Sequence, residues 1–252
     1  MVGTDQVATD QECRAVVVYA LGRFEVLVGG EPLRFVFKAP RKPLDLLKGL
    51  LIAGGGSVGQ HTLCEALWPD LDSWSAGRAL NTAVFRLRKL LGDKATIRVD
   101  CGQLCLDGQH CRVDAWDFES DITNSTDPDT LLNALLRYRG PFLGDSEHPM
   151  ALETRRRLQR KFLRGLLQLG QNYERCGNFG SAIDLYNRGL DVEGDSEELH
   201  GALISCLDRA GQAASAAAAY QRCSALLKNR SPTLSTGPGW SAELARLLRT
   251  NR

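Results

Sequence analysis

Five positions in the second half of the chain recur 34 residues later, and this repetition constrains the fold more than any other feature. The pairs are Leu169 and Leu203, Tyr173 and Leu207, Gly177 and Gly211, Ala182 and Ala216, and Tyr186 and Tyr220. A fixed period of this length indicates one supersecondary unit stacked on copies of itself. Small residues let two helices approach, and the large ones fill the groove between them. The sequence therefore predicts an array of helix pairs.

The spacing of 34 residues is the tetratricopeptide period, so we expect an all-α helical repeat domain of this kind over 128–252. Two repeats are few, and flanking helices must complete their core. Helices near 129–138 and 150–168 are expected to cap one end of the array, and the segment after Trp240 the other. The residues expected to face inward on the helix at 150–168 are Leu152, Leu158, Phe162, Leu163 and Leu166.

The first half begins with the composition of β-strands. Residues 16–37 are rich in β-branched residues, with a turn pair at Gly29-Gly30, and LRFVF (33–37) is expected to return as another strand. Later, TIRVDCGQLCLDGQHCRVDAW alternates and is broken at Cys101-Gly102 and again at Asp107-Gly108. This is a hairpin pattern.

Three helices are predicted between these β segments. The first begins at Pro43 and ends at the glycines 54–56, the second runs from about Gln60 to Leu67, and the third from about Ser75 to Leu91, closed by Gly92. The apolar stripe of the first is expected to consist of Leu44, Leu47, Leu50 and Leu51. Strands, three helices and a hairpin together predict an α+β winged helix-turn-helix domain with an N-terminal β-sheet over 15–119.

The helix at 75–91 has two incompatible faces. At helical spacing one side collects the apolar residues Leu80, Ala83, Val84, Leu87, Leu90 and Leu91. The other side collects Arg78, Asn81, Thr82, Phe85, Arg88 and Lys89, with Arg86 on the flank. Arginine, lysine, asparagine and threonine contact phosphates and base edges, and an exposed phenylalanine suits a thymine methyl group. We therefore interpret 75–91 as a DNA-recognition helix in the major groove.

Charge supports this interpretation only locally. The whole chain has 31 basic and 30 acidic residues, a formal net charge of +1. Between Ser75 and Arg98, by contrast, Asp93 is the one acidic residue, and the basic ones are Arg78, Arg86, Arg88, Lys89, Lys94 and Arg98. Positive charge is thus concentrated where phosphates would lie, and binding to DNA should be modest and sensitive to salt.

Other classes of protein find little support in the sequence. No apolar run approaches a membrane span, and the polar, acidic residues 1–14 indicate a flexible tail, so we expect a cytoplasmic protein without a membrane role. Cysteines within periodic apolar patterns should be reduced core residues: Cys64, Cys176, Cys206 and Cys223. No catalytic arrangement is present, so we expect no enzyme, no cofactor and no metal. The polar stretch 120–130 is expected to separate the two domains.

These residues together resemble the bacterial transcriptional activator domain regulators, a SARP-like family that joins an OmpR/PhoB-type winged helix to a tetratricopeptide-like domain. The resemblance covers about residues 16–250. It is carried by RKPLDLLKGLLIAGGGSV, LCEALWPD, RALNTAVFRLRKLLG, IRVDCGQLCLDG followed by RVDAWDFE, and YRGPFLGD, in this order.

The resemblance implies a sequence-specific DNA-binding transcriptional regulator, usually an activator. It also implies homodimers on direct repeats of double-stranded DNA, and a loop that contacts RNA polymerase, here Pro69, Asp70, Leu71, Asp72, Ser73 and Trp74. Further DNA contacts are expected from the start of the second helix at Thr62 and from the wing at Arg98, Gly102 and Gln103. Two departures are Gly59, where a Ser or Thr helix cap is usual, and Asp100 near the wing tip, where a carboxylate would repel phosphates.

Several alternatives stay open at this point. The basic helix 153–164 is a solvated face or a site for an anion or partner, formed by Arg155, Arg156, Arg160 and Arg164. The helical repeats suit a small-molecule effector such as a nucleotide second messenger, or a protein-interaction adaptor. GGGSVGQHT (54–62) imitates a phosphate-binding loop without its lysine. Cys101, Cys105 and Cys111 with His110 invite a zinc or redox interpretation, although no C-x2-C pair is present.

Overall fold

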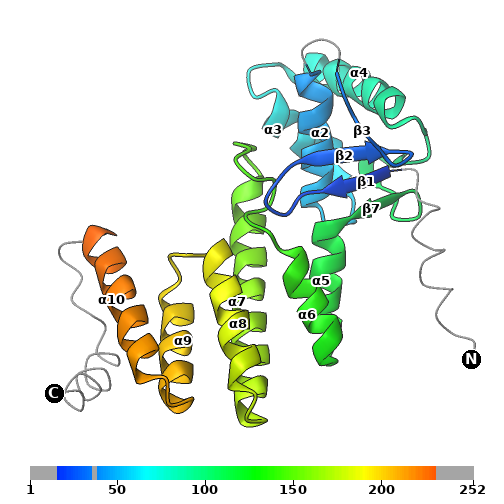
Figure 1. Cartoon of the computed structure of the whole chain (residues 1–252). Helices are drawn as coiled ribbons and strands as arrows, with labels where there is room; N and C mark the ends of the chain where they lie inside the picture. Colours follow the sequence, from blue (N-terminus) through cyan, green and yellow to red (C-terminus); the bar gives the residue numbers. More distant parts are fainter. Residues whose placement is uncertain (1–15, 36–38, 231–252) are drawn as a thin grey trace, which may run out of the picture. The chain divides into compact units, whose positions relative to one another are not determined.

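The computed structural model describes residues 16–35 and 39–230. Within this range the backbone forms two compact units (Figure 1). The first comprises residues up to 126 together with Leu136–Arg160, and the second comprises Asp127–Leu135 and the residues from 161 onward. The expected domain limits, 15–119 and 128–252, stay a prediction, and the expected tail at 1–14 lies outside the described residues.

A four-stranded sheet opens the first unit. Its strands β1 (Val16–Tyr19), β2 (Glu25–Val28), β3 (Glu31–Pro32) and β7 (Cys111–Val113) lie in the order β3-β2-β1-β7. β1 pairs antiparallel with β2 and parallel with β7. Gly29 and Gly30 have φ values of 60° and 85°, so the expected turn is confirmed.

The prediction of a returning strand at LRFVF (33–37) is wrong for residues 33–35, which the structure describes. β3 ends at Pro32, and residues 33–35 have no strand structure, while residues 36 and 37 lie outside the described range. Pairing with β2 continues for one more hydrogen bond, from Leu33 N–H to Val26 O at 2.8 Å, and residues 34 and 35 add no strand to it.

The three predicted helices are present. They are α2 (Arg41–Ile52), α3 (Gln60–Leu67) and α4 (Ser73–Leu91). The bounds of the second are confirmed, and the first and the third begin two residues earlier than predicted. α2 begins two residues before Pro43, because the N–H groups of the first turn have no intrahelical partner and a proline is tolerated there. Its stripe also includes Leu46, and Leu44 is only half-buried.

The wing is a three-stranded sheet of β4 (Val58–Gly59), β6 (Gln103–Leu106) and β5 (Ile97–Asp100), in that order. Cys101 and Gly102 have φ values of 45° and 77°, which is the two-residue turn that the sequence predicts. The second break, at Asp107-Gly108, does not make a hairpin. β7 leaves the wing there and joins β1 in the N-terminal sheet, a parallel partner that local alternation does not reveal.

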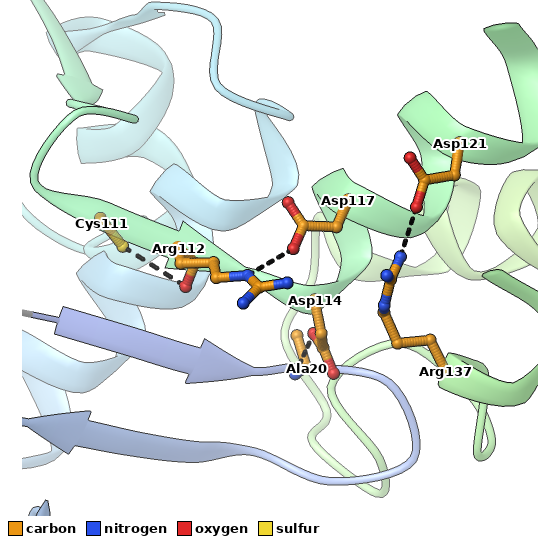
Figure 2. A network of polar contacts seen from close by, with 7 residues as sticks. All are labelled: Ala20, Cys111, Arg112, Asp114, Asp117, Asp121 and Arg137. Atoms are coloured by element: carbon orange, nitrogen blue, oxygen red, sulfur yellow. Dashed lines mark hydrogen bonds and ion pairs between the residues drawn. The ribbon is translucent and has the colours of Figure 1, made fainter. Parts of the chain in front are cut away.

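α5 (Asp114–Asn124) follows β7, and its first residue anchors the end of β1. The carboxylate of Asp114 accepts a hydrogen bond from the backbone N–H of Ala20 at 2.7 Å (Figure 2). It accepts a second one from the N–H of Leu21 at 3.2 Å. Burial raises the pKa of this carboxyl group, although the backbone donors oppose the shift. Asp114 thereby satisfies two N–H groups at the point where the chain leaves the sheet.

The expected linker at 120–130 is shorter than its composition suggests. Residues 120–124 are the last part of α5, and α6 (Pro128–Arg137) begins after only three further residues. The Arg137 guanidinium pairs with Asp121 at 2.6 Å, as Figure 2 shows. The polar residues in this stretch thus lie on helix surfaces. Polar composition alone is the same for an exposed helix surface and for a loop.

The segment between α6 and α7 (Ala151–Arg175) is packed against the end of β1 within the first unit. Gly22 N–H donates to Pro141 O at 3.0 Å, and Leu143 N–H donates to Ala20 O at 2.6 Å. Arg155 of α7 donates to the carbonyl oxygens of Phe142 at 2.7 Å and Gly144 at 2.8 Å, and to that of Ser146. Arg155 is half-buried by these contacts, so it does not stand on an open cationic face.

Replacing Arg155 by alanine is expected to destabilise the protein by about 2 kcal/mol, because carbonyl oxygens would lose a charged donor. The measurement is urea denaturation followed by circular dichroism. Arg156→Ala is the matched control, since Arg156 is an exposed neighbour on the same helix. Equal midpoints for Arg155→Ala and Arg156→Ala would contradict the assignment.

His148 in the same segment is buried and hydrogen-bonded as a neutral ring. Its Nδ1 accepts from Met150 N–H at 3.3 Å, which leaves Nε2 to donate to Asp45 O at 3.1 Å. Burial lowers the pKa of His148 below 6.5, and nearby Lys48 acts in the same direction, while the backbone contact to Asp45 and its carboxylate oppose it. The unfolded chain therefore takes up this proton at a higher pH than the folded chain.

Stability is accordingly expected to fall as the pH drops below 6.5 toward the lower pKa of folded His148. Above pH 6.5 the contribution of neutral His148 to the free energy of unfolding is fully present. Melting temperatures between pH 8 and 5 should show this slope in the wild type and a weaker slope in His148→Gln. A slope in His148→Gln equal to that of the wild type would contradict the buried, neutral state of His148.

The second unit confirms the helical repeat. α7 is followed by α8 (Phe179–Val192), α9 (Glu197–Arg209) and α10 (Ala213–Arg230), and α9 packs between α8 and α10 (Figure 1). Gly177 and Gly211 have φ values of 74° and 75°. Asn178 N–H donates to Tyr173 O and Gln212 N–H to Leu207 O, both at 2.9 Å. Backbone geometry therefore repeats with the sequence period.

Some expectations for this half need correction. The helix expected at 150–168 continues without a break to Arg175, so the capping helix and the first repeat helix are one element. Leu152 is 56% exposed because it lies on the outer side of α7, and Leu163 is half-buried. Cys176 is exposed and Cys64 half-buried, whereas Cys206 and Cys223 are buried as expected. The segment after Trp240 lies outside the described residues.

Candidate nucleic-acid interface

Helix α4 is held at both ends by local contacts. The carboxylate of Asp72 accepts from the N–H groups of Trp74 and Ser75, both at 3.0 Å. The hydrogen bond from the Ser75 side chain, followed by these backbone hydrogen bonds, lowers the pKa of Asp72. This cap explains why the helix begins at Ser73 and not at Ser75. Gly92, with φ 76°, ends the helix in the left-handed conformation.

The two faces of α4 are confirmed by burial. The buried residues are Ala76, Leu80, Ala83, Val84, Leu87 and Leu91, and Leu90 is half-buried. The exposed ones include Arg78, Asn81, Thr82, Phe85, Arg86 and Lys89. No acidic residue occurs between Ser73 and Leu91, so cationic and amide groups share the exposed face with one aromatic ring.

Two predicted members of this face have additional contacts. Arg88 is half-buried, and its Nη2 donates to the carbonyl oxygen of Ile97 at 2.6 Å, which ties the end of α4 to strand β5 of the wing. Its expected place on the open face is therefore wrong: the guanidinium turns toward a backbone acceptor. The Arg78 guanidinium lies over the Trp74 ring, 4.8 Å from its centroid, and is oriented by it.

The wing is tied to the start of α3. Gln60 N–H donates to Gly102 O at 2.9 Å, and the register pairs Gly59 with Gln103. Gly59 caps α3 without a side-chain hydrogen bond, as expected, and Thr62 is exposed in the first turn. One N–H of this helix terminus is thus already used by the wing, which leaves less of it for a phosphate.

The exposed side chains of the wing carry charges of both signs. Arg98 Nη1 lies 3.7 Å from Asp107 Oδ2, and Asp100 stands opposite Gln103 beside the Cys101-Gly102 turn. The expected DNA contacts Arg98, Gly102 and Gln103 are all exposed. The carboxylate of Asp100 is exposed as well, in the position where it would repel a phosphate.

A groove of about 640 Å³ lies between α4 and the wing. Its lining includes predicted contact residues of α4, namely Asn81, Phe85, Arg88 and Lys89. It also includes Gln60, Lys94 and Val99, which sequence reasoning did not select as contacts. Lys94 was counted only as local charge, and nothing in the period of strand β5 singles out Val99 before its neighbours are known.

The loop at 69–74 presents apolar surface. Leu71 is 45% exposed and Trp74 is 69% exposed, beside a hollow of about 550 Å³ between α3 and the start of α4. Asp72 is occupied as the helix cap. The loop therefore offers a tryptophan and a leucine to a partner, and acidic Asp70 stands next to them in the sequence.

The remaining cationic candidates lie on α7. Arg156, Arg160 and Arg164 are exposed, and Arg160 has a weak contact of 3.5 Å with Glu153. Arg157, which was not a candidate, pairs with Glu119. The basic run is thus divided between structural contacts and a solvated face.

The metal and phosphate-loop alternatives gain no support. Cys111 belongs to the four-stranded sheet, while Cys101 and Cys105 belong to the wing. Residues 16–35 and 39–230 hold no group of three potential ligands suited to a metal ion. Gly54 and Gly55, with φ values of 66° and 87°, end helix α2 and do not connect a strand to a helix.

Comparison with known proteins decides the family. A sequence profile of the bacterial transcriptional activator domain matches residues 122–247, half of the chain. The chain belongs to the bacterial transcriptional activator domain family. This membership confirms the resemblance found in the sequence, and it places the protein among transcriptional regulators. No curated protein sequence matches the chain significantly.

Comparison with solved structures finds one with the same fold. EmbR of Mycobacterium tuberculosis, determined in complex with a low-affinity phosphopeptide, superposes with a TM-score of 0.68 at 21% sequence identity. The match covers 95% of the present chain and 66% of the EmbR chain. The present chain therefore spans just under two thirds of the length of EmbR. At this identity the likeness concerns the fold, and it confirms a winged helix joined to helical repeats.

Among the helices that the structure describes, none is both long and apolar enough to cross a membrane.

Proposed function

We propose that this protein is a sequence-specific DNA-binding transcriptional activator of the cytoplasm. Helix α4 enters the major groove, with Asn81, Thr82, Phe85 and Lys89 toward the bases and Arg78 and Arg86 toward the phosphates. The observation that carries the proposal is the composition of the exposed face of α4, which lacks carboxylates and faces away from the core. Membership in an activator family supports the same function.

The helical repeats supply protein contacts in this proposal. A homodimer formed through them would place two copies of α4 on a direct repeat and so compensate for a wing with an acidic tip. The exposed Leu71 and Trp74 serve as the surface for RNA polymerase. Aromatic residues of this kind are enriched at interfaces because they bury a large area with few rotatable bonds.

Selection of binding sites from a pool of random DNA tests the proposal. The full chain should enrich one motif repeated in the same orientation, with affinity that falls steeply as salt increases. Enrichment of no motif, together with equal affinity for all duplexes, would overturn sequence-specific binding.

Removal of the carboxylate at the wing tip is expected to strengthen DNA binding. Asp100→Asn removes one negative charge beside the proposed path of the DNA backbone, so we expect affinity about threefold higher at low salt and a smaller gain at high salt. Asp184→Asn, at an exposed aspartate of α8, changes the net charge equally and should leave affinity unchanged. Equal gains from both variants would assign the effect to net charge alone.

A second candidate function rests on a hollow in the second unit. A groove of about 700 Å³ is lined by Ile183, Leu203 and Leu207 together with the polar groups of Asn187 and Arg222. We propose it as the site for a small effector such as a nucleotide second messenger, since arginine suits phosphate groups. Thermal shift against a panel of cyclic nucleotides tests this candidate, and an Arg222→Ala variant should lose any shift.

A further inference from the structure

The groove between α4 and the wing has an apolar floor that opens to solvent at two large side chains. Leu80, Val84 and Leu104 form the floor. Phe85 is 69% exposed and Val99 is 44% exposed, and both line the same groove. Its volume of about 640 Å³ lies in the range of cavities that admit whole chemical groups. The groove is therefore large enough to receive the edge of a base.

The position of Val99 follows from the register of the wing. Val99 pairs with Leu104 and Ile97 with Leu106, so Val99 lies on the face of the hairpin that carries the buried residues. Ile97, Leu104 and Leu106 on this face are buried. Arg98 and Asp100 alternate to the opposite face. Val99 is thus the residue of the apolar wing face that is exposed in the groove beside α4.

Polar groups surround this apolar pair. Asn81 and Gln60 carry amides, and Arg88, Lys89 and Lys94 carry positive charge, whereas the lining described includes no acidic side chain. An arrangement of amides and cations around an apolar centre complements a DNA strand. Lys94 suits a phosphate, and Lys89 and the amides suit base edges, while the Arg88 guanidinium is held by the carbonyl oxygen of Ile97.

We propose that Phe85 and Val99 determine specificity by taking up the 5-methyl group of a thymine in the operator. Among the groups that base pairs present in the major groove, the thymine methyl is the apolar one. A polar base edge placed against Phe85 would lose its hydration without a hydrogen bond in return. The inference rests on the proposed DNA binding and adds the chemistry of one contact.

Replacement of thymine by deoxyuridine in the selected operator tests the proposal, because it removes only the methyl group. Each thymine of a half-site is replaced singly, and equilibrium binding is measured by fluorescence anisotropy. At one or two positions the wild type should bind the uridine site about fourfold more weakly, the factor expected for one buried methyl group.

Variants identify the residues that detect the methyl group. Phe85→Ala and Val99→Ala should each bind thymine and uridine sites with more nearly equal affinity at those positions. Leu152→Ala, which removes an exposed apolar side chain of α7 that does not line the groove, should keep the full fourfold difference. Since Phe85 is largely exposed, its removal should leave the melting temperature unchanged, and this is checked for every variant.

The outcomes separate this inference from the function on which it rests. If an operator is selected but uridine is tolerated at every position, the methyl contact is wrong and DNA binding stands. Discrimination that survives in both Phe85→Ala and Val99→Ala also overturns the inference. Failure to select any operator contradicts the proposed function itself.

Discussion

Replacement of Arg86 and Lys89 together by alanine is expected to weaken binding to the selected operator by on the order of 100-fold. Both side chains are exposed on α4. Loss of the phosphate contact of Arg86 should also lower the slope of log affinity against log salt by about 1. Fluorescence anisotropy over a range of salt concentrations measures both quantities.

The matched control removes two charges elsewhere. Arg156→Ala with Arg160→Ala changes the net charge by the same amount at exposed positions of α7. This pair is expected to leave affinity for the operator within about twofold of the wild type. A comparable loss in both double variants would move the DNA contact away from α4 and toward general charge attraction.

Gly170→Ala is expected to destabilise the second unit by about 3 kcal/mol and to lower its melting temperature by about 10 °C. A Cβ at Gly170 would lie 2.4 Å from ring atoms of Tyr186, which is fully buried between the helices. Tyr186 cannot move without cost, because its hydroxyl group donates to Glu174 Oε1 at 2.8 Å and Glu174 also pairs with Arg209. The change therefore disturbs both packing and a buried polar contact.

Gly180→Ala separates this effect from the general consequence of replacing glycine in a helix. Gly180 lies in α8, where an added Cβ has nothing within 4 Å. That variant should be stabilised slightly, by up to about 1 kcal/mol, because alanine is the better helix former. Differential scanning calorimetry of the two variants makes the comparison. Destabilisation of Gly180→Ala equal to that of Gly170→Ala would contradict close packing at Gly170.

Where a structural feature depends on local periodicity, the sequence was sufficient to predict it. The stripe that includes Leu80 and Leu87 located the buried face of α4, and the recurrence of Gly177 at Gly211 located the repeated turn. The Cys101-Gly102 turn followed from the same kind of local pattern. Such features are set by residues within one helix or one hairpin, so a single sequence contains their full description.

Features that depend on distant partners could not be predicted in this way. β7 pairs with β1 across almost a hundred residues, and Asp114 accepts from Ala20 over a similar separation. From the sequence, Arg88 and Arg155 are predicted to be exposed cations. In the structure each guanidinium donates to a backbone carbonyl oxygen. Val99 became a candidate only when its register against Leu104 was known.

The central claim is that the exposed face of α4 selects sites on DNA. Chromatin immunoprecipitation with sequencing tests it most directly, in cells that express either the wild type or the Arg86→Ala, Lys89→Ala double variant at equal levels. The account predicts discrete wild-type peaks that share a directly repeated motif, and loss of those peaks in the variant. Occupancy of the same peaks by the variant would contradict it.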